Sequence, residues 1–261
     1  MVLSPELRAE LANLTAQVRA QLEVEAELGA VGLRVDVAPQ PAAVLESQPR
    51  SAPTPRTAAA EVARSPALDP GERRARLQVL AEAAASCQAC VLHEKRNKSV
   101  FARGSPDAEL VFVGEGPGRD EDQQGYPFEG AAGQLLDKMI AAMGYGRDDV
   151  YVCNVVKCRP PENRTPRPEE AIACSKFLVP QLEIVAPKVI VALGRCAAQA
   201  LGVAQESGPW RGRWGKWRGT ETMPTYHPAF LLRSPEFKRT VWEDLQQVMA
   251  RLGREPARRS T

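Results

Sequence analysis

The amino-acid sequence predicts an α/β fold of three layers, α/β/α, in which helices cover both faces of a mostly parallel central sheet of about four strands. The first observation behind this prediction is that short apolar runs alternate along the chain with longer segments of helical periodicity. The second is that two of these runs, 108–114 and 188–194, end in glycine, as a buried strand leading into a turn does. Such alternation is typical of parallel strands joined by helices.

The elements can be assigned in chain order from residue 71 to residue 253. Apolar runs of strand length predict four strands, at 108–114, 150–158, 188–194 and 221–228. Helical periodicity predicts five helices, at 72–87, 131–144, 166–187, 195–202 and 234–253. The residues that follow His227 are expected to form a loop.

The first 70 residues differ in composition from the rest. We predict a helix within residues 1–30, because Ser4 can cap it, Pro5 suits its first turn and leucines recur at helical spacing. Residues 31–70 are rich in Pro and Ala and contain little to bury, so we expect a disordered linker there. The sequence therefore predicts a folded domain at 71–253, followed by a basic tail at 254–261.

The net charge of +2 hides an uneven distribution. Residues 1–70 hold six Lys and Arg against nine Asp and Glu, whereas the remainder holds 28 against 23. A mildly basic domain is compatible with a nucleic-acid partner but does not require one. Since the chain has no run of about 18 apolar residues and no basic start followed by an apolar stretch, we expect no membrane span and a reducing, cytoplasmic setting. There, cysteines act as metal ligands or core residues more often than as disulfides.

Unusual residues gather at the predicted carboxyl ends of the strands. Glu115 follows the first strand, Asn154 lies within the second and His227 lies at the end of the fourth. In open parallel sheets, ligands bind beyond these strand ends. The glycine-rich segment 114–133 can turn backbone amides toward a ligand, although it lacks the Lys–Ser/Thr pair of a phosphate-binding loop. We therefore expect one ligand site at this edge of the sheet.

Four cysteines have a spacing compatible with metal ligation, namely Cys87, Cys90, Cys158 and Cys174. Thiolates suit zinc and iron–sulfur clusters alike, so the spacing does not choose between them. The alternative is a set of unrelated core thiols, because free cysteine is often buried. Cys153, inside an apolar strand, and Cys196, in an Ala-rich helix, are interpreted as core residues.

Residues 87–239 resemble the family 4 uracil-DNA glycosylases, an iron–sulfur group of bacteria and archaea. The resemblance rests on motifs that follow one another along the chain: CQAC (87–90), GEGPGRDED with GYPFEGAAGQLL (114–136), NVVKCRPPENR (154–164), Cys174 and TYHPAFLLR (225–233). It implies a three-layer domain that removes uracil from DNA in base excision repair. It also implies a [4Fe–4S] cluster on the four cysteines, so the resemblance, and not the spacing, favours iron over zinc.

The resemblance further implies how the pocket works on a uracil that has been flipped out of the DNA. Phe128 would stack on the base, and the side-chain amide of Asn154 would accept from N3–H and donate to O4, a pattern that cytosine reverses. His227 would stabilise the charge that develops near O2, and Glu115 would position the attacking water. Three of these residues also have a structural interpretation: Phe128 as a core ring, Asn154 as a hydrogen-bonded core amide and His227 as a structural histidine.

The same resemblance implies roles for further residues. Backbone amides at Glu115 and Gly116 are expected to touch the base, and Glu121 to help exclude the methyl group of thymine. Leucines after His227 are expected to fill the gap left by the flipped base, and arginines to contact phosphates, unless they are surface charges. These predicted DNA contacts are Arg159, Arg164, Leu231, Leu232 and Arg233. The basic, Trp-containing segment 211–219 fits a DNA-facing ribbon and a hairpin packed on the core equally well.

The sequence also bears on two other functional hypotheses. A related group traps uracil-DNA covalently through a histidine near the third cysteine, but the chain has only His93 and His227, neither of them between residues 158 and 174. A non-catalytic iron–sulfur protein that only binds uracil-DNA would not need a carboxylate at 115. We expect a monomer that acts on single- or double-stranded uracil-containing DNA at the nucleoid, with a first segment available to an unknown protein partner. Glu129 departs from the family pattern, in which an apolar residue usually follows the phenylalanine.

Overall fold

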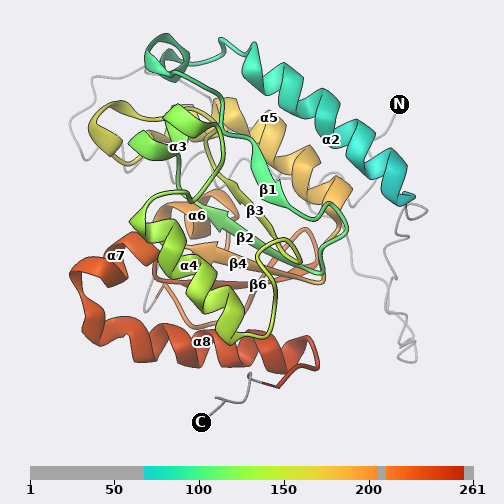
Figure 1. The fold of residues 1–261 in the computed structure, drawn as a ribbon, viewed down its shortest axis with the longest axis vertical. Coiled ribbons are helices and arrows are strands. Elements are labelled where there is room, and N and C mark those ends of the chain that lie inside the picture. The colour runs from blue at the N-terminus through green and yellow to red at the C-terminus, as the bar shows by residue number, and fades with distance from the viewer. Residues whose placement is uncertain (1–67, 205–209, 256–261) are drawn as a thin grey trace, which may run out of the picture. The chain divides into compact units, whose positions relative to one another are not determined.

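The computed structural model describes residues 68–204 and 210–255. The predicted helix at 1–30, nearly all of the predicted linker and most of the basic tail lie outside these residues. The described residues form a six-stranded sheet with helices on both of its faces (Figure 1). Within them, no helix combines the length and the apolar character needed to cross a lipid bilayer.

Four parallel strands form the centre of the sheet, in the spatial order β3 (Tyr151–Asn154), β2 (Leu110–Gly114), β4 (Val189–Leu193) and β6 (Thr220–Thr225). Two shorter strands pair antiparallel along the outer edges, namely β1 (Ala102–Gly104) beside β3 and β5 (Gly215–Trp217) beside β6. The predicted mostly parallel sheet is confirmed. The edge strands were not predicted, because three residues are too few to show an alternating pattern.

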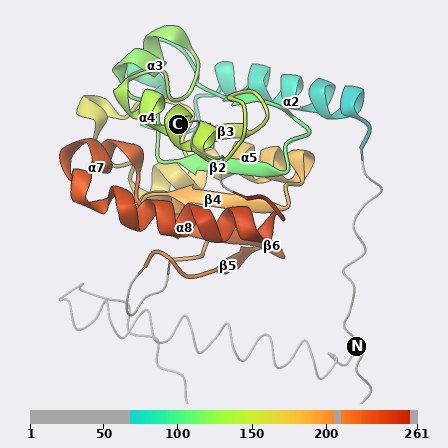
Figure 2. The ribbon, with the colours of Figure 1, turned by 60° about the horizontal axis from the view of Figure 1, so that its bottom comes forward.

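The helices divide between the two faces of the sheet (Figure 2). One face packs against α2 (Pro70–Ala85), α5 (Pro168–Val185) and α6 (Arg195–Ala200). The other packs against α4 (Ala131–Ala142), α7 (Pro228–Arg233) and α8 (Lys238–Arg251). Side chains of β2 alternate between these two cores, with Val111 on the first and Phe112 on the second. This arrangement confirms the three predicted layers.

Two short helices interrupt segments that the sequence presents as loops. α3 (Arg119–Gln124) lies inside the glycine-rich segment. The prediction of a loop after His227 is wrong: α7 begins at Pro228, with His227 as its N-cap. Proline suits the first position of a helix because it has no N–H to leave unpaired there. The remaining short elements are 3₁₀ turns at Val91–Lys95, Pro161–Asn163 and Pro235–Phe237.

Segment 211–219 forms part of a hairpin. Its strand β5 pairs with β6, and Trp217 is buried in the core on the α2 side. Trp214 packs partly buried against the other core. Of the two interpretations of this segment, the hairpin that packs its tryptophans on the domain agrees with the structure.

Candidate functional site

The parallel register brings the predicted pocket residues to one edge of the sheet. Gly114 at the end of β2 pairs with Asn154 at the end of β3. Glu115, the next residue after Gly114, therefore lies at the same edge of the sheet as Asn154. A Cβ atom on Gly114 would lie 2.4 Å from Asn154 Oδ1 and 2.6 Å from Phe128 Cζ. Only glycine at 114 therefore lets the amide and the aromatic ring meet over the end of the strand.

Asn154 has an unsatisfied polar atom. The residue is 2% exposed, and its Oδ1 has no hydrogen-bond partner among the described residues. Leaving a buried acceptor unpaired costs about 1–3 kcal/mol, so such atoms often mark a place where a ligand or water binds. The structure thus supplies an amide oxygen beside an aromatic ring, which is what a planar, hydrogen-bonding ligand requires.

His227 is held in one tautomer by the start of α7. Its Nδ1 accepts a hydrogen bond of 3.1 Å from the backbone N–H of Ala229, so in the neutral ring the proton lies on Nε2. Burial and, to a smaller extent, the charge of Arg233 lower the pKa of His227 to about 4. Near neutral pH the side chain is therefore an uncharged donor through Nε2–H. Its ring stacks against Phe128, with centroids 5.5 Å apart.

Glu115 is the partly buried carboxylate of this edge. Burial raises its pKa above the ordinary value of 4.5, while a hydrogen bond with Thr165 acts in the opposite direction. Its backbone carbonyl accepts from Val156 N–H at 3.2 Å, which ties it to the chain after β3. A Cβ atom on Gly116 would lie 2.8 Å from Val156 Cγ2, so the backbone here also requires glycine.

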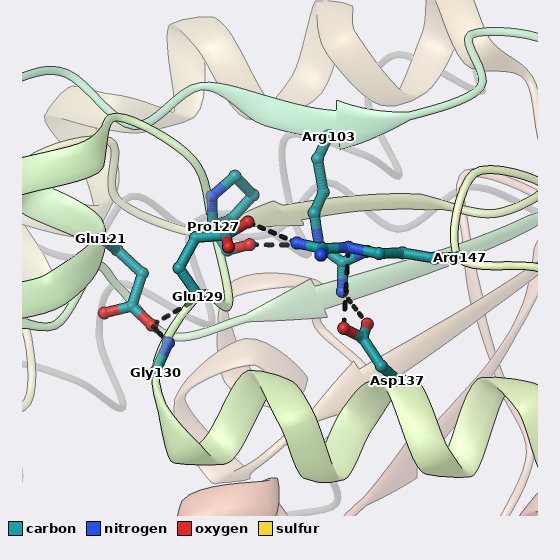
Figure 3. A network of polar contacts seen from close by, with 7 residues as sticks. All are labelled: Arg103, Glu121, Pro127, Glu129, Gly130, Asp137 and Arg147. Atoms are coloured by element: carbon teal, nitrogen blue, oxygen red, sulfur yellow. Dashed lines mark hydrogen bonds and ion pairs between the residues drawn. The ribbon is translucent and has the colours of Figure 1, made fainter.

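Glu121 organises the loop that carries Phe128. Its Oε2 accepts from Gly118 N–H at 3.0 Å. Its Oε1 accepts from the N–H groups of Glu129 and Gly130 at 3.1 Å each (Figure 3). A carboxylate with three backbone donors is a strong, charge-assisted anchor. The contacts of Glu121 in this structure are thus with the loop itself, and the predicted exclusion of the thymine methyl group stays a prediction.

The predicted DNA contacts lie in different surroundings. Leu232 is 45% exposed and Arg233 is exposed on the same helix. Leu231 is 1% exposed and belongs to the core with α4 and α8, so its predicted DNA contact disagrees with the structure. Arg164 forms two hydrogen bonds, of 2.8 and 2.6 Å, with Glu170, and Arg159 Nε donates to Asn163.

The four predicted ligand cysteines line one enclosed cavity between the end of α2, the chain after β3 and α5. Cys87, Cys90, Cys158 and Cys174 all contribute to its wall. Arg96 Nη1 donates to Cys158 Sγ at 3.1 Å, and the backbone N–H of Lys157 donates to Cys174 Sγ at 3.3 Å. N–H donors around sulfur are a feature of iron–sulfur sites.

The side chains around this cavity do not converge on a single point. Among the described residues, no three His, Cys, Asp or Glu side chains converge closely enough to share one metal ion. Ligands of a four-iron cluster bind different iron atoms, so they surround a common space instead of one point. Burial raises the pKa of the Cys174 thiol to about 11. A bound metal would stabilise the thiolate of this residue.

Two buried basic residues near the site were not predicted from the sequence. Lys157 is 1% exposed, and its Nζ donates to the backbone carbonyl of Asn154 at 2.8 Å and to Gln181 Oε1 at 2.6 Å. Arg103 is 9% exposed and reaches from β1 to the loop before Phe128. Neither has a sequence signal, because a basic residue in a short segment looks like a surface charge.

Comparisons with known proteins identify the family of similar proteins. Residues 101–246 match the model of the uracil DNA glycosylase superfamily. The chain is 45% identical over 184 residues to a type-4 uracil-DNA glycosylase of Thermotoga maritima, which covers 69% of this chain and 96% of that protein. It is 44% identical over 174 residues to a type-4 uracil-DNA glycosylase of Archaeoglobus fulgidus, covering 62% of this chain and 86% of that protein. A type-5 uracil-DNA glycosylase of Thermus thermophilus is 33% identical over 127 residues, which is 41% of this chain and 58% of that protein.

Proposed function

The chain belongs to the type-4 uracil-DNA glycosylases of the uracil DNA glycosylase superfamily, and we propose that it hydrolyses the N-glycosidic bond of uracil in the pocket between Phe128 and Asn154. Uracil excision from DNA, as a step of DNA repair, is the activity of this family. A protein that only binds or covalently traps uracil-DNA is the less favoured alternative. The observation that carries the assignment of the pocket is the unpartnered Oδ1 of Asn154 beside the ring of Phe128.

Uracil supplies the partners that this pocket lacks. Its N3–H donates to Asn154 Oδ1, and its O4 accepts from the amide Nδ2 of the same side chain. Cytosine presents the opposite pattern at these two positions, so it would leave both groups unpaired. Stacking on Phe128 adds about 1–3 kcal/mol for each base that stacks on an aromatic ring, which offsets part of the cost of flipping the nucleotide.

Cleavage of the bond then depends on a neutral hydrogen-bond donor and on a negatively charged carboxylate. The departing uracil gains negative charge on O2, and the Nε2–H of neutral His227 donates to that oxygen without needing to lose a proton. The ionised carboxylate of Glu115 orients a water molecule and stabilises positive charge on the sugar. The products are free uracil and an abasic site in the DNA.

We further propose that Cys87, Cys90, Cys158 and Cys174 hold a [4Fe–4S] cluster. When bound, the cluster supplies a structural cross-link between α2, the chain after β3 and α5. Support comes from the shared cavity and from the N–H donors of Arg96 and Lys157. Since Asn154 lies four residues before Cys158, a fixed cluster also fixes the chain that follows the base-reading residue. No step of the hydrolysis needs the cluster.

The proposed substrates are single- and double-stranded DNA that contain uracil. We propose that the enzyme is a monomer and acts on this DNA in the cytoplasm, at the nucleoid. We retain the predictions of a helix at 1–30, a linker at 31–70 and a basic tail at 254–261. The first of these segments is proposed to be available to an unknown protein partner. These assignments rest on composition and on the resemblance of the domain.

An excision assay tests the proposal directly. The full chain is incubated with an oligonucleotide that contains one uracil, and with a matched strand that contains thymine or cytosine there. Abasic sites should form only in the uracil strand, and Glu115→Gln should lower their rate of formation. A heat-stable protein–DNA adduct would instead indicate covalent trapping, and binding without abasic sites would indicate a non-catalytic protein.

A further inference from the structure

We propose that Arg103 is a positioning residue for the base-stacking ring of Phe128, an inference that rests on the proposed role of that ring. Arg103 lies on the edge strand β1 and does not reach the pocket itself. It acts through the backbone of Pro127, the residue before Phe128. The elements that meet here, β1, the loop before α4 and α4, are shown in Figure 3.

Phe128 needs such support because its backbone is strained. Its φ is +59°, a left-handed conformation that non-glycine residues seldom adopt and that costs about 1–3 kcal/mol. The conformation also requires Gly133, since a Cβ atom there would lie 1.8 Å from the carbonyl oxygen of Phe128. The ring reaches the pocket only while the surrounding contacts hold this conformation.

Arg103 fixes the peptide before Phe128. Its Nε donates to the carbonyl of Pro127 at 3.1 Å, and its Nη2 donates to Asp137 Oδ1 of α4 at 2.5 Å. The Arg103 side chain is 6% exposed, so its bond to Pro127 is buried, whereas its bond to Asp137, which is 28% exposed, is partly buried. One planar guanidinium thereby ties the loop to α4 and to β1 at the same time (Figure 3).

The peptides after Phe128 are fixed from the other side. Glu121 Oε1 accepts from the N–H groups of Glu129 and Gly130. A more exposed ion pair joins the side chain of Glu129 to Arg147, which also lies 3.6 Å from Asp137 Oδ2. Phe128 is therefore held between two buried or partly buried anchors, with Arg103 as the anchor before it.

Lysine could not replace Arg103 in this role. The guanidinium uses two separate N–H groups of a rigid fork, whereas an ammonium group at the end of a flexible stem cannot hold both partners in this geometry. Arg103→Lys keeps the charge, so the variant isolates the loss of geometry. A shift of the ring by about 1 Å lowers catalysis by up to about 100-fold in well-aligned sites.

A double-mutant cycle tests the inference with the full-length protein. Arg103→Lys, Phe128→Leu and the double variant are compared for kcat/KM on uracil-containing single strands and for inhibition by free uracil. Arg103→Lys should lower kcat/KM about ten-fold and weaken inhibition by uracil, but should do neither in the Phe128→Leu background. Arg239→Ala, which removes an exposed ion pair with Glu243 on α8, is the control and should leave kcat/KM within two-fold of the parent (about 0.4 kcal/mol at RT ln 2).

The outcomes separate the inference from the proposed function. If Phe128→Leu excises uracil normally, the stacking role fails. If Phe128→Leu is impaired and Arg103→Lys lowers kcat/KM equally in both backgrounds, the stacking role stands and the positioning role is overturned. If Arg103→Lys does not fold, Asp137→Asn takes its place, since it removes the charge that orients Arg103; an equal loss in both backgrounds overturns the inference again. A smaller fraction of folded protein would lower the measured rate but would not weaken inhibition by free uracil. Weakened inhibition therefore separates a positioning role from a loss of folded protein.

Discussion

The rings of Phe128 and His227 lie with their centroids 5.5 Å apart and their planes inclined by 27°, although 99 positions separate them in the sequence. Phe128 comes from the loop that precedes α4, and His227 caps α7. Both helices pack on the same face of the sheet, through the core that includes Leu136 and Leu231. The packing of these helices therefore sets the distance between the stacking ring and the proposed O2 donor.

The first prediction concerns His227→Asn. Asparagine can still accept from the N–H of Ala229 and cap α7, so the melting temperature should change little. It cannot place a donor where Nε2–H lies, so kcat should fall by about 10²–10³-fold, as when other oxyanion-type donors are removed. Single-turnover excision measures the loss, and a rate within two-fold of the parent would exclude His227 as the O2 donor.

The second prediction concerns pH. Because burial raises the pKa of Glu115 above 4.5, its carboxylate becomes protonated, and kcat/KM should fall, as the pH drops through that raised value. His227 is already neutral there, since its pKa is about 4, so it should give no inflection near its ordinary value of about 6.5. In a pH–rate profile, Glu115→Gln should remove the acid limb along with at least about 10²-fold of the rate. An acid limb that survives in Glu115→Gln would contradict the assignment.

The residues in and around the site differ in how well their roles could be predicted from the sequence. Asn154 stood out because a polar side chain interrupts an apolar strand, and the parallel strand order then placed it beside Glu115. Arg103 did not stand out, because an edge strand of three residues is too short to show an alternating pattern. Lys157 looked like a charge next to a cysteine, and only the folded chain shows it buried against the carbonyl of Asn154.

The third prediction concerns Asn154→Asp. An ionised aspartate cannot donate to uracil O4 and would place negative charge against it, so excision should fall by at least about 10²-fold. The substitution is isosteric, and the folded structure should persist. Circular dichroism and excision kinetics together test this expectation; a retained rate would mean that Asn154 does not read the base.

The fourth prediction concerns the cysteine cavity. The purified protein should be brown and should contain iron and acid-labile sulfide in equal amounts. Cys158→Ala should lose the colour and unfold at lower temperature, because the cross-link between α2 and α5 is lost. Cys153→Ala, a buried thiol outside the cavity, is the matched control and should keep the iron. A colourless protein that contains zinc would overturn the cluster.

The fifth prediction uses two adjacent leucines of α7 that the sequence could not tell apart. A loop would have exposed both side chains, whereas a helix places Leu231 in the core and leaves Leu232 45% exposed. Leu231→Ala should therefore destabilise the protein by about 2–5 kcal/mol, as other buried leucine truncations do. It should not change the ratio of excision rates on duplex and single-stranded DNA.

Leu232→Ala should behave in the opposite way. An exposed truncation changes stability by no more than about 0.5 kcal/mol. If the side chain fills the gap left by the flipped base, it gains about 1.5–3 kcal/mol of apolar burial in the duplex complex, so its removal should slow duplex excision about ten-fold or more. A single strand has no such gap, so its excision should stay near the parent rate. Equal losses on both substrates would mean that Leu232 does not act as a wedge.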